Sequence, residues 1–100
     1  MAILPDHEAV NYRYDVQSMI KHPDLKRDDK NRIRDHINKD CIGDCLLVIG
    51  MSGLIKVHFH TDEPEKLRDV LGQYGDFENF DIEDMKEQFE AFKAKQKENQ

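Results

Sequence analysis

Apolar and polar residues alternate along the first part of the chain. Between Val10 and Ile20, valine, tyrosine, serine and isoleucine occupy every second position, and mostly polar residues fill the positions between them. This two-residue period predicts a β-strand with one buried face. The polar face of the strand carries Asp15. The segment His-Pro-Asp at 22–24 ends the strand.

The following segments predict one helix and one β-hairpin. From Lys26 to Lys39 the chain is strongly charged, and its few apolar residues suit a helix that covers a sheet with a narrow stripe. Two compact apolar runs, 45–49 and 54–60, flank the short segment Gly-Met-Ser-Gly. Two strands joined by a short glycine-bounded link form a β-hairpin. The apolar stripe of the predicted helix, described above, consists of Leu25, Ile33 and Ile37.

The remaining segments complete an α+β fold. Thr61-Asp62-Glu63-Pro64 predicts a helix start capped by Thr61 or Asp62, and Gly75 ends that helix. Residues 77–82 predict a last strand, residues 85–92 a further helix and residues 93–100 a polar tail. The order is that of the ferredoxin-like split βαβ sandwich (βαββαβ), with a C-terminal helical extension. Its two helices cover one face of the sheet and leave the other face open.

Composition narrows the partners and the compartment. The chain has 100 residues, which predicts a single domain over 1–100. Its formal net charge of −6 argues against nucleic acid or an anionic membrane as the main partner. No apolar stretch approaches the roughly 20 residues of a membrane span, and the N-terminus does not resemble a secretory signal. We therefore expect a cytoplasmic protein with both cysteines, Cys41 and Cys45, as thiols.

The second strand of the hairpin carries two histidines, His58 and His60, on one face. Between and beside them, Ile55, Val57 and Phe59 are apolar and suit the face under the helices. The histidines are therefore expected on the open face. A two-residue turn at 51–52 would pair Gly50 with Gly53, which places Cys45 opposite His58 and Leu47 opposite Lys56.

These residues predict a candidate metal site. The first and third strands are adjacent in ferredoxin-like topology, so Asp15 is expected to reach His58 and His60, with Cys45 as a further candidate. Carboxylate, imidazole and thiolate are all zinc ligands. Asp62 and Thr61 follow the strand and are candidates for a hydrogen bond that orients one of the histidines without contacting the metal. The plainer interpretation is that the histidines are ordinary polar residues of a wet sheet face.

A long stretch of the chain resembles a known family. The segment GDCLLVIGMSGLIKVHFHTDEPEKL (43–67) is similar to the central domain of the bacterial DAK2-type, dihydroxyacetone kinase-like proteins, among them the fatty acid kinase A proteins. That family reads Gly-Asp-Ser, an apolar strand, a polar turn and then Lys-Val-His-x-His-Thr-Asp-x-Pro. The segments YRYDVQSMI (12–20) and QYGDFENFDIEDMKEQ (73–88) continue the resemblance, which covers about residues 12–88.

The resemblance implies a function for the same residues and also a departure. In the family, a cysteine of the first strand and the two histidines are implicated in function and can hold zinc. The histidines correspond to His58 and His60, but Asp15 replaces the cysteine, and Cys45 stands where the family usually has serine. The nucleotide-binding domain of the family precedes this region and its acyl-carrier-binding domain follows it. The chain thus resembles a free-standing middle domain without kinase activity of its own.

Two classes of function follow from the sequence. The first is a non-catalytic interaction and regulatory module, which forms a homodimer or docks on a kinase-like or acyl-carrier protein through its open face. That face is expected to expose Leu47, Ile49 and Leu54. The second is a small metal-dependent enzyme, or a metal or ligand sensor, that uses Asp15, His58 and His60.

Overall fold

A computed structural model describes residues 11–98 of the chain, with side chains up to residue 92. The described residues form four strands and three helices in the order that the sequence predicts, which confirms the α+β split βαβ plan. The elements are β1 (Tyr14–Lys21), α1 (Asp29–Asp40), β2 (Gly43–Met51), β3 (Leu54–Thr61), α2 (Pro64–Leu71), β4 (Asp76–Asp84) and α3 (Met85–Glu98).

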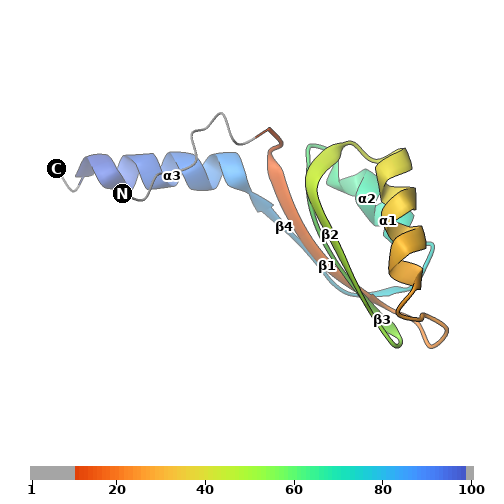
Figure 1. Ribbon diagram of the computed structural model, residues 1–100. Helices are drawn as coiled ribbons and strands as arrows, with labels where there is room; N and C mark the ends of the chain where they lie inside the picture. Colours follow the sequence, from red (N-terminus) through yellow and green to blue (C-terminus); the bar gives the residue numbers. More distant parts are fainter. Residues whose placement is uncertain (1–10, 99–100) are drawn as a thin grey trace.

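The four strands form one antiparallel sheet in the order β2-β3-β1-β4. As predicted, β1 and β3 are neighbours at its centre, and β2 and β4 are its edges. Figure 1 shows α1 and α2 against one face of the sheet, whereas α3 extends away from the sheet beyond β4. We call the opposite face, toward which the side chains of Asp15, Gln17, Asp44, Leu47, Ile49, Met51, Lys56, His58 and His60 point, the open face.

The core lies between the sheet and the two covering helices. Alternate residues of the central strands, among them Val16, Ile20 and Phe59, are at most 1% exposed. Ile33 and Ile37 of α1 are fully buried against them, as the sparse apolar stripe predicts. Because strand side chains alternate between the two faces, burial of one set directs the other set to the open face.

Two elements begin later than the sequence predicts. The helix α1 starts at Asp29 instead of Lys26, because the Asp29 carboxylate accepts a hydrogen bond from the Lys26 backbone N–H and holds that residue in a turn. The strand β1 starts at Tyr14, because the Arg13 backbone N–H donates to Asp62 Oδ1 instead of to a neighbouring strand. The predicted start of that strand, Val10, lies outside the described residues.

The hairpin register differs from the predicted one. Met51 pairs with Leu54, so the central turn residues are Ser52 and Gly53 instead of Met51 and Ser52. The reason is the backbone of Gly53, whose φ of 77° belongs to the left-handed region that glycine adopts without steric cost. The pairing therefore shifts by two residues. Because a shift by an even number keeps each side chain on its face, Leu47 and the residues between it and the turn point to the predicted side of the sheet.

The two C-terminal helices also correct the predicted boundaries. The helix α2 has Glu63 as its N-terminal flanking residue without a side-chain cap, so neither Thr61 nor Asp62 caps it. The helix α3 continues through Glu98, although residues 93–100 were predicted as a polar tail. Its start is well defined, because Asp84 Oδ1 accepts a hydrogen bond from the Glu87 backbone N–H. None of the helices in the described part of the chain has the length and apolar content needed to cross a membrane.

We predict that Gly50→Ala destabilises the domain by about 1–3 kcal/mol, the usual cost of overpacking. A Cβ at Gly50 would overlap the backbone carbonyl of Arg27, which cannot rotate away as a side chain could. The matched control is Gly72→Ala at the end of α2, where the nearest atom to the new Cβ lies 3.3 Å away. Urea unfolding of both variants measures the difference, and equal midpoints would contradict the close approach of β2 to the loop before α1.

Candidate metal centre

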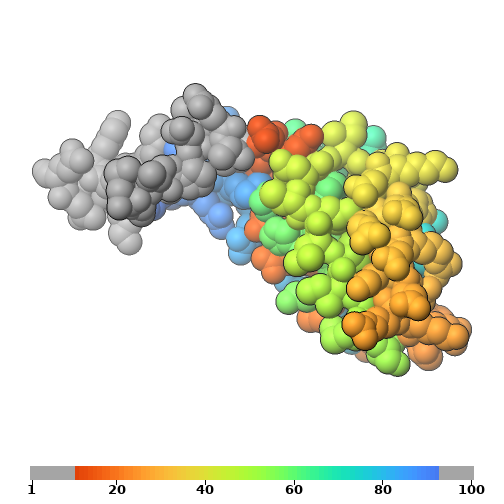
Figure 2. Space-filling view, viewed as in Figure 1, coloured from red at the N-terminus to blue at the C-terminus, as the bar shows by residue number. Residues whose placement is uncertain are grey.

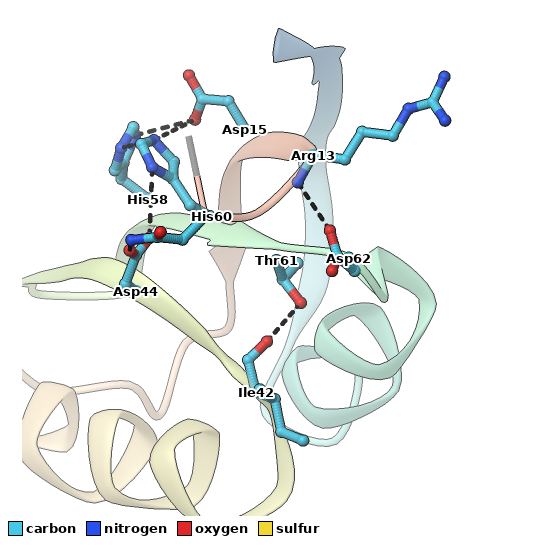
Figure 3. Close-up of polar contacts among 9 residues, drawn as sticks. Arg13, Asp15, Ile42, Asp44, His58, His60, Thr61 and Asp62 are labelled. Carbon is cyan, nitrogen blue, oxygen red and sulfur yellow. Dashed lines mark hydrogen bonds and ion pairs between the residues drawn. The ribbon is translucent and has the colours of Figure 1, made fainter. Parts of the chain in front are cut away.

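The central strands bring three predicted site residues together on the open face. Asp15 of β1 is the direct cross-strand partner of His60 on β3, and Gln17 is the partner of His58. Figure 3 shows both imidazoles and the Asp15 carboxylate turned toward one another above the sheet. The predicted convergence of Asp15, His58 and His60 follows directly from the register of β1 with β3.

The distances within this cluster are those of a compact polar site. The Nε2 atoms of the two histidines lie 3.2 Å apart. Asp15 Oδ1 lies 3.4 Å from His58 Nδ1 and 3.7 Å from His60 Nε2. A tetrahedral zinc ion with bonds of about 2.0–2.1 Å separates its ligand atoms by roughly 3.3 Å. The 3.2 Å and 3.4 Å distances involve different nitrogens of His58, and one ligand atom from each of the three residues lies within 4.8 Å of the other two. A small adjustment of the side chains would bring three ligand atoms to the spacing around one cation.

Burial makes the Asp15 carboxylate unusual. Its Oδ1 atom is shielded from solvent and has no hydrogen-bond partner among the described residues, although two imidazoles lie within ion-pair distance. A buried polar atom without a partner costs about 1–3 kcal/mol. A cation between Asp15 and the histidines, or a proton on a histidine, would remove that cost. Two imidazoles and a carboxylate therefore fit a zinc ion chemically.

A bulge in β2 changes the expected position of Cys45. The pairs Asp44–His60 and Leu47–His58 leave Cys45 and Leu46 together opposite Phe59. Leu47 and not Cys45 is therefore the partner of His58, which corrects the predicted pairing. Cys45 is exposed, and its φ of 56° lies in the left-handed region, which is uncommon for a residue other than glycine.

The bulge also places a residue that sequence reasoning missed. It turns Asp44 to the open face, where Asp44 Oδ1 lies 3.6 Å from His60 Nδ1. The second carboxylate oxygen accepts a hydrogen bond of 3.4 Å from the Asn11 side chain. With regular pairing, Asp44 would have pointed to the opposite face. The only sign of Asp44 in the sequence is the Gly-Asp pair before the apolar run, and alternation alone does not predict a bulge from that pair.

Asp44, Cys45 and His60 form a second group of ligand-type atoms, all within 4.8 Å of one another. Slight burial and the carboxylate of Asp44 raise the pKa of the Cys45 thiol. A thiol with a raised pKa is a poorer metal ligand, because the thiolate is the form that binds. Cys45 is thus near the candidate site but chemically less suited to it than the histidines are.

Thr61 and Asp62 make their described hydrogen bonds with the backbone. Thr61 Oγ1 donates to the Ile42 carbonyl at 2.8 Å and accepts from the Glu63 N–H at 3.1 Å. Asp62 Oδ1 accepts from the Arg13 N–H at 2.7 Å (Figure 3). These contacts tie the end of β3 to the segments before β1 and β2, and so position the strand that carries the histidines.

Fold and site together define a split βαβ domain with a carboxylate–histidine cluster on its uncovered sheet face. The sequence model that describes the middle domain of the fatty acid kinase A-like proteins matches residues 11–92. The chain therefore belongs to this family, and the family resemblance seen in its motifs is confirmed.

Curated relatives match the same part of the chain. Protein YloV of Bacillus subtilis (strain 168) is 32% identical over 82 residues, which are 81% of this chain and 14% of that protein. An uncharacterized protein of Staphylococcus aureus (strain USA300) is 33% identical over 82 residues, which are 81% of this chain and 15% of that protein. The chain thus spans about a seventh of the length of these relatives.

We predict that Cys45→Gly stabilises the domain by about 1 kcal/mol, because a left-handed backbone costs roughly 1–2 kcal/mol for residues with a Cβ. Cys45→Ala removes the thiol but keeps the Cβ, so its stability should stay close to that of the parent. Chemical unfolding under reducing conditions compares the three proteins. A stabilisation by alanine as large as that by glycine would show that the thiol and not the backbone is the source of strain.

Proposed function

We propose that this domain is a non-catalytic regulatory module that holds a divalent cation, zinc above all, between Asp15, His58 and His60. The observation that carries the proposal is the shielded Asp15 Oδ1, which has no hydrogen-bond partner among the described residues and lies beside two imidazoles. Membership of the middle-domain family supports it, because the family resemblance assigns zinc-binding capacity to the same two histidines.

The cation would join the two central strands. Asp15 belongs to β1, whereas His58 and His60 belong to β3. A bound zinc ion supplies two positive charges and a cross-link between its ligands, and binding to the folded state adds directly to stability. The side chains of His58, His60 and Asp15 are 33%, 23% and 18% exposed, so an ion or a partner group can reach them from solvent.

A regulatory role fits this position better than catalysis. The family match is to the middle domain, and in the family the nucleotide is held by a different domain. The three candidate ligands lie on an open sheet face beside exposed apolar side chains, which is the setting of a docking surface. A metal-dependent enzyme that uses the same three residues is the alternative, and its substrate would bind in the shallow pockets beside them, one lined by Asp15 and one by His58.

We expect zinc to bind the parent domain and to raise its free energy of unfolding, by about 2.7 kcal/mol at 100 times the dissociation constant. Replacing both histidines, His58→Ala with His60→Ala, should weaken binding by more than about 100-fold, because losing an outer partner alone costs 10–100-fold. Calorimetric titration with zinc, on protein purified without a histidine tag, measures the affinity.

Two controls sharpen the zinc experiment. His22→Ala alters an exposed histidine of the loop after β1 and should leave zinc affinity unchanged. Asp15→Cys introduces the ligand that the family carries at this position and should tighten binding, since thiolate is a softer ligand for zinc. Equal, negligible heats for the parent and the double variant would remove the metal from the proposed function.

A second proposed function is dimer formation through β2. Leu47, Ile49 and Met51 are 55%, 41% and 42% exposed on the open face of this edge strand. Leu47 and Ile49 line a shallow groove together with Lys56 and His58. The other edge strand, β4, is rich in aspartate and glutamate, a composition that discourages edge contacts. Figure 2 shows the β2 segment at the surface beside α1.

A second copy of this chain is the partner we propose for β2. A two-fold contact is the commonest form of assembly and would bring the apolar residues of the two copies together while the acidic β4 edges stay apart. A kinase-like or an acyl-carrier protein on the same surface is the alternative outcome, in which the isolated domain stays monomeric and the partner binds there.

We predict a dimer by light scattering at roughly tens of micromolar. The double change Leu47→Lys with Ile49→Lys should give a monomer, because it places two buried charges in the contact. The matched control is Ile42→Lys, since Ile42 is 69% exposed but precedes β2. A monomeric parent domain, or a dimer that survives the double change, would contradict this assembly.

A further inference from the structure

The Gly43-Asp44-Cys45 segment at the start of β2 combines a close approach to β3 with a bulge, and the three proposed zinc ligands do not by themselves explain this conformation. Gly43 pairs with Thr61, and a side chain at Gly43 would overlap the His60 carbonyl and the Phe59 ring. β2 can therefore approach β3 closely just before the bulge. The bulge then turns Asp44 toward His60, at the cost of a left-handed backbone at Cys45.

The two ring nitrogens of His60 face different groups. Its Nε2 lies 3.2 Å from His58 Nε2 and 3.7 Å from Asp15 Oδ1, on the side of the candidate cation. Its Nδ1 points the other way, toward Asp44 Oδ1 at 3.6 Å (Figure 3). A movement of Nδ1 by a few tenths of an ångström would bring it to the roughly 3.2 Å limit of a good hydrogen bond.

Asp44 is held in place to serve as an acceptor. Its Oδ2 already accepts from the Asn11 side chain, which leaves Oδ1 directed at the imidazole. A neutral imidazole carries its proton on one nitrogen and offers a lone pair on the other. A carboxylate at Nδ1 favours the tautomer with the proton on Nδ1. The Nε2 lone pair of His60 then accepts a hydrogen bond from the His58 Nε2–H in the empty site and is available to a cation in the filled one.

We infer that Asp44 is the positioning residue of His60: it fixes the Nδ1–H tautomer and the ring orientation that direct Nε2 to the ion between Asp15 and His58. This inference rests on the proposed zinc site for its consequence, but the tautomer itself is a property of the metal-free protein. Metal-bound histidines generally donate their second N–H to a carboxylate, a carbonyl or water, which sets their orientation.

The bulge is explained by this role. A regular β2 would place Cys45 opposite His60 and turn Asp44 toward the helix-covered face. The extra residue exchanges the two, so that a carboxylate and not a thiol stands behind the imidazole. Cys45 is then a structural member of the bulge.

Nitrogen NMR of the metal-free protein at mildly alkaline pH tests the inference directly. In the parent we expect His60 to be mainly in the Nδ1–H tautomer, and in Asp44→Asn and Asp44→Ala to shift toward Nε2–H. In zinc titrations the same two variants should bind about 10–100-fold more weakly. His22→Ala, which alters an exposed histidine away from the site, is the control and should change neither the tautomer of His60 nor the zinc affinity.

Each outcome separates this inference from the proposed function. If the parent binds zinc but the Asp44 variants keep both its tautomer and its affinity, the positioning role is overturned and the zinc site stands. If the parent binds no zinc while the tautomer still depends on Asp44, the zinc site fails and the positioning contact stands. Loss of zinc affinity in Cys45→Ala would overturn the inference in another way, by making the thiol a direct ligand. Retained chemical-shift dispersion in each variant confirms that it is folded.

Discussion

The antiparallel pairing of β1 with β3 is the constraint on which both the core and the candidate site depend. These strands lie at the centre of the sheet, and their register sets Val16 opposite Phe59 and Asp15 opposite His60. The first pair is buried under the helices, and the second lies on the open face. A slip of one residue would expose the apolar set and bury the polar one, so the burial of the core also fixes the position of the candidate ligands.

The alternation of apolar and polar residues predicts which side chains of β1 and β3 are buried and which lie on the open face, because that division depends only on the two-residue period of strands. It identifies the faces of β1 and β3, and the topology of the split βαβ plan makes the two strands neighbours. The convergence of Asp15, His58 and His60 follows from those two facts alone. The boundaries of α1 and β1 depend instead on single hydrogen bonds, such as that from the Arg13 N–H to Asp62, which no periodicity reveals.

The position of Asp44 could not be predicted for a different physical reason. A bulge inserts one residue into a strand and exchanges the faces of everything before it, and its signature is a local backbone angle at Cys45. The turn register depends in the same way on the backbone of Gly53. Both features are decided by φ angles at single residues, whereas the hydrophobic pattern reports only the average period.

Asp15 stands where the family resemblance implies a cysteine, and this difference bears on what the proposed zinc site could hold. An aspartate provides a hard oxygen ligand, which suits zinc less well than a thiolate does. It also brings a negative charge into a position where one oxygen has no hydrogen-bond partner among the described residues. A thiol in the same place could remain neutral when the site is empty, whereas a carboxylate needs a nearby proton or cation to offset its charge. In the proposed zinc site the substitution would therefore destabilise the empty state and also weaken the filled one, and the balance between these two effects would decide how strongly the domain responds to a cation.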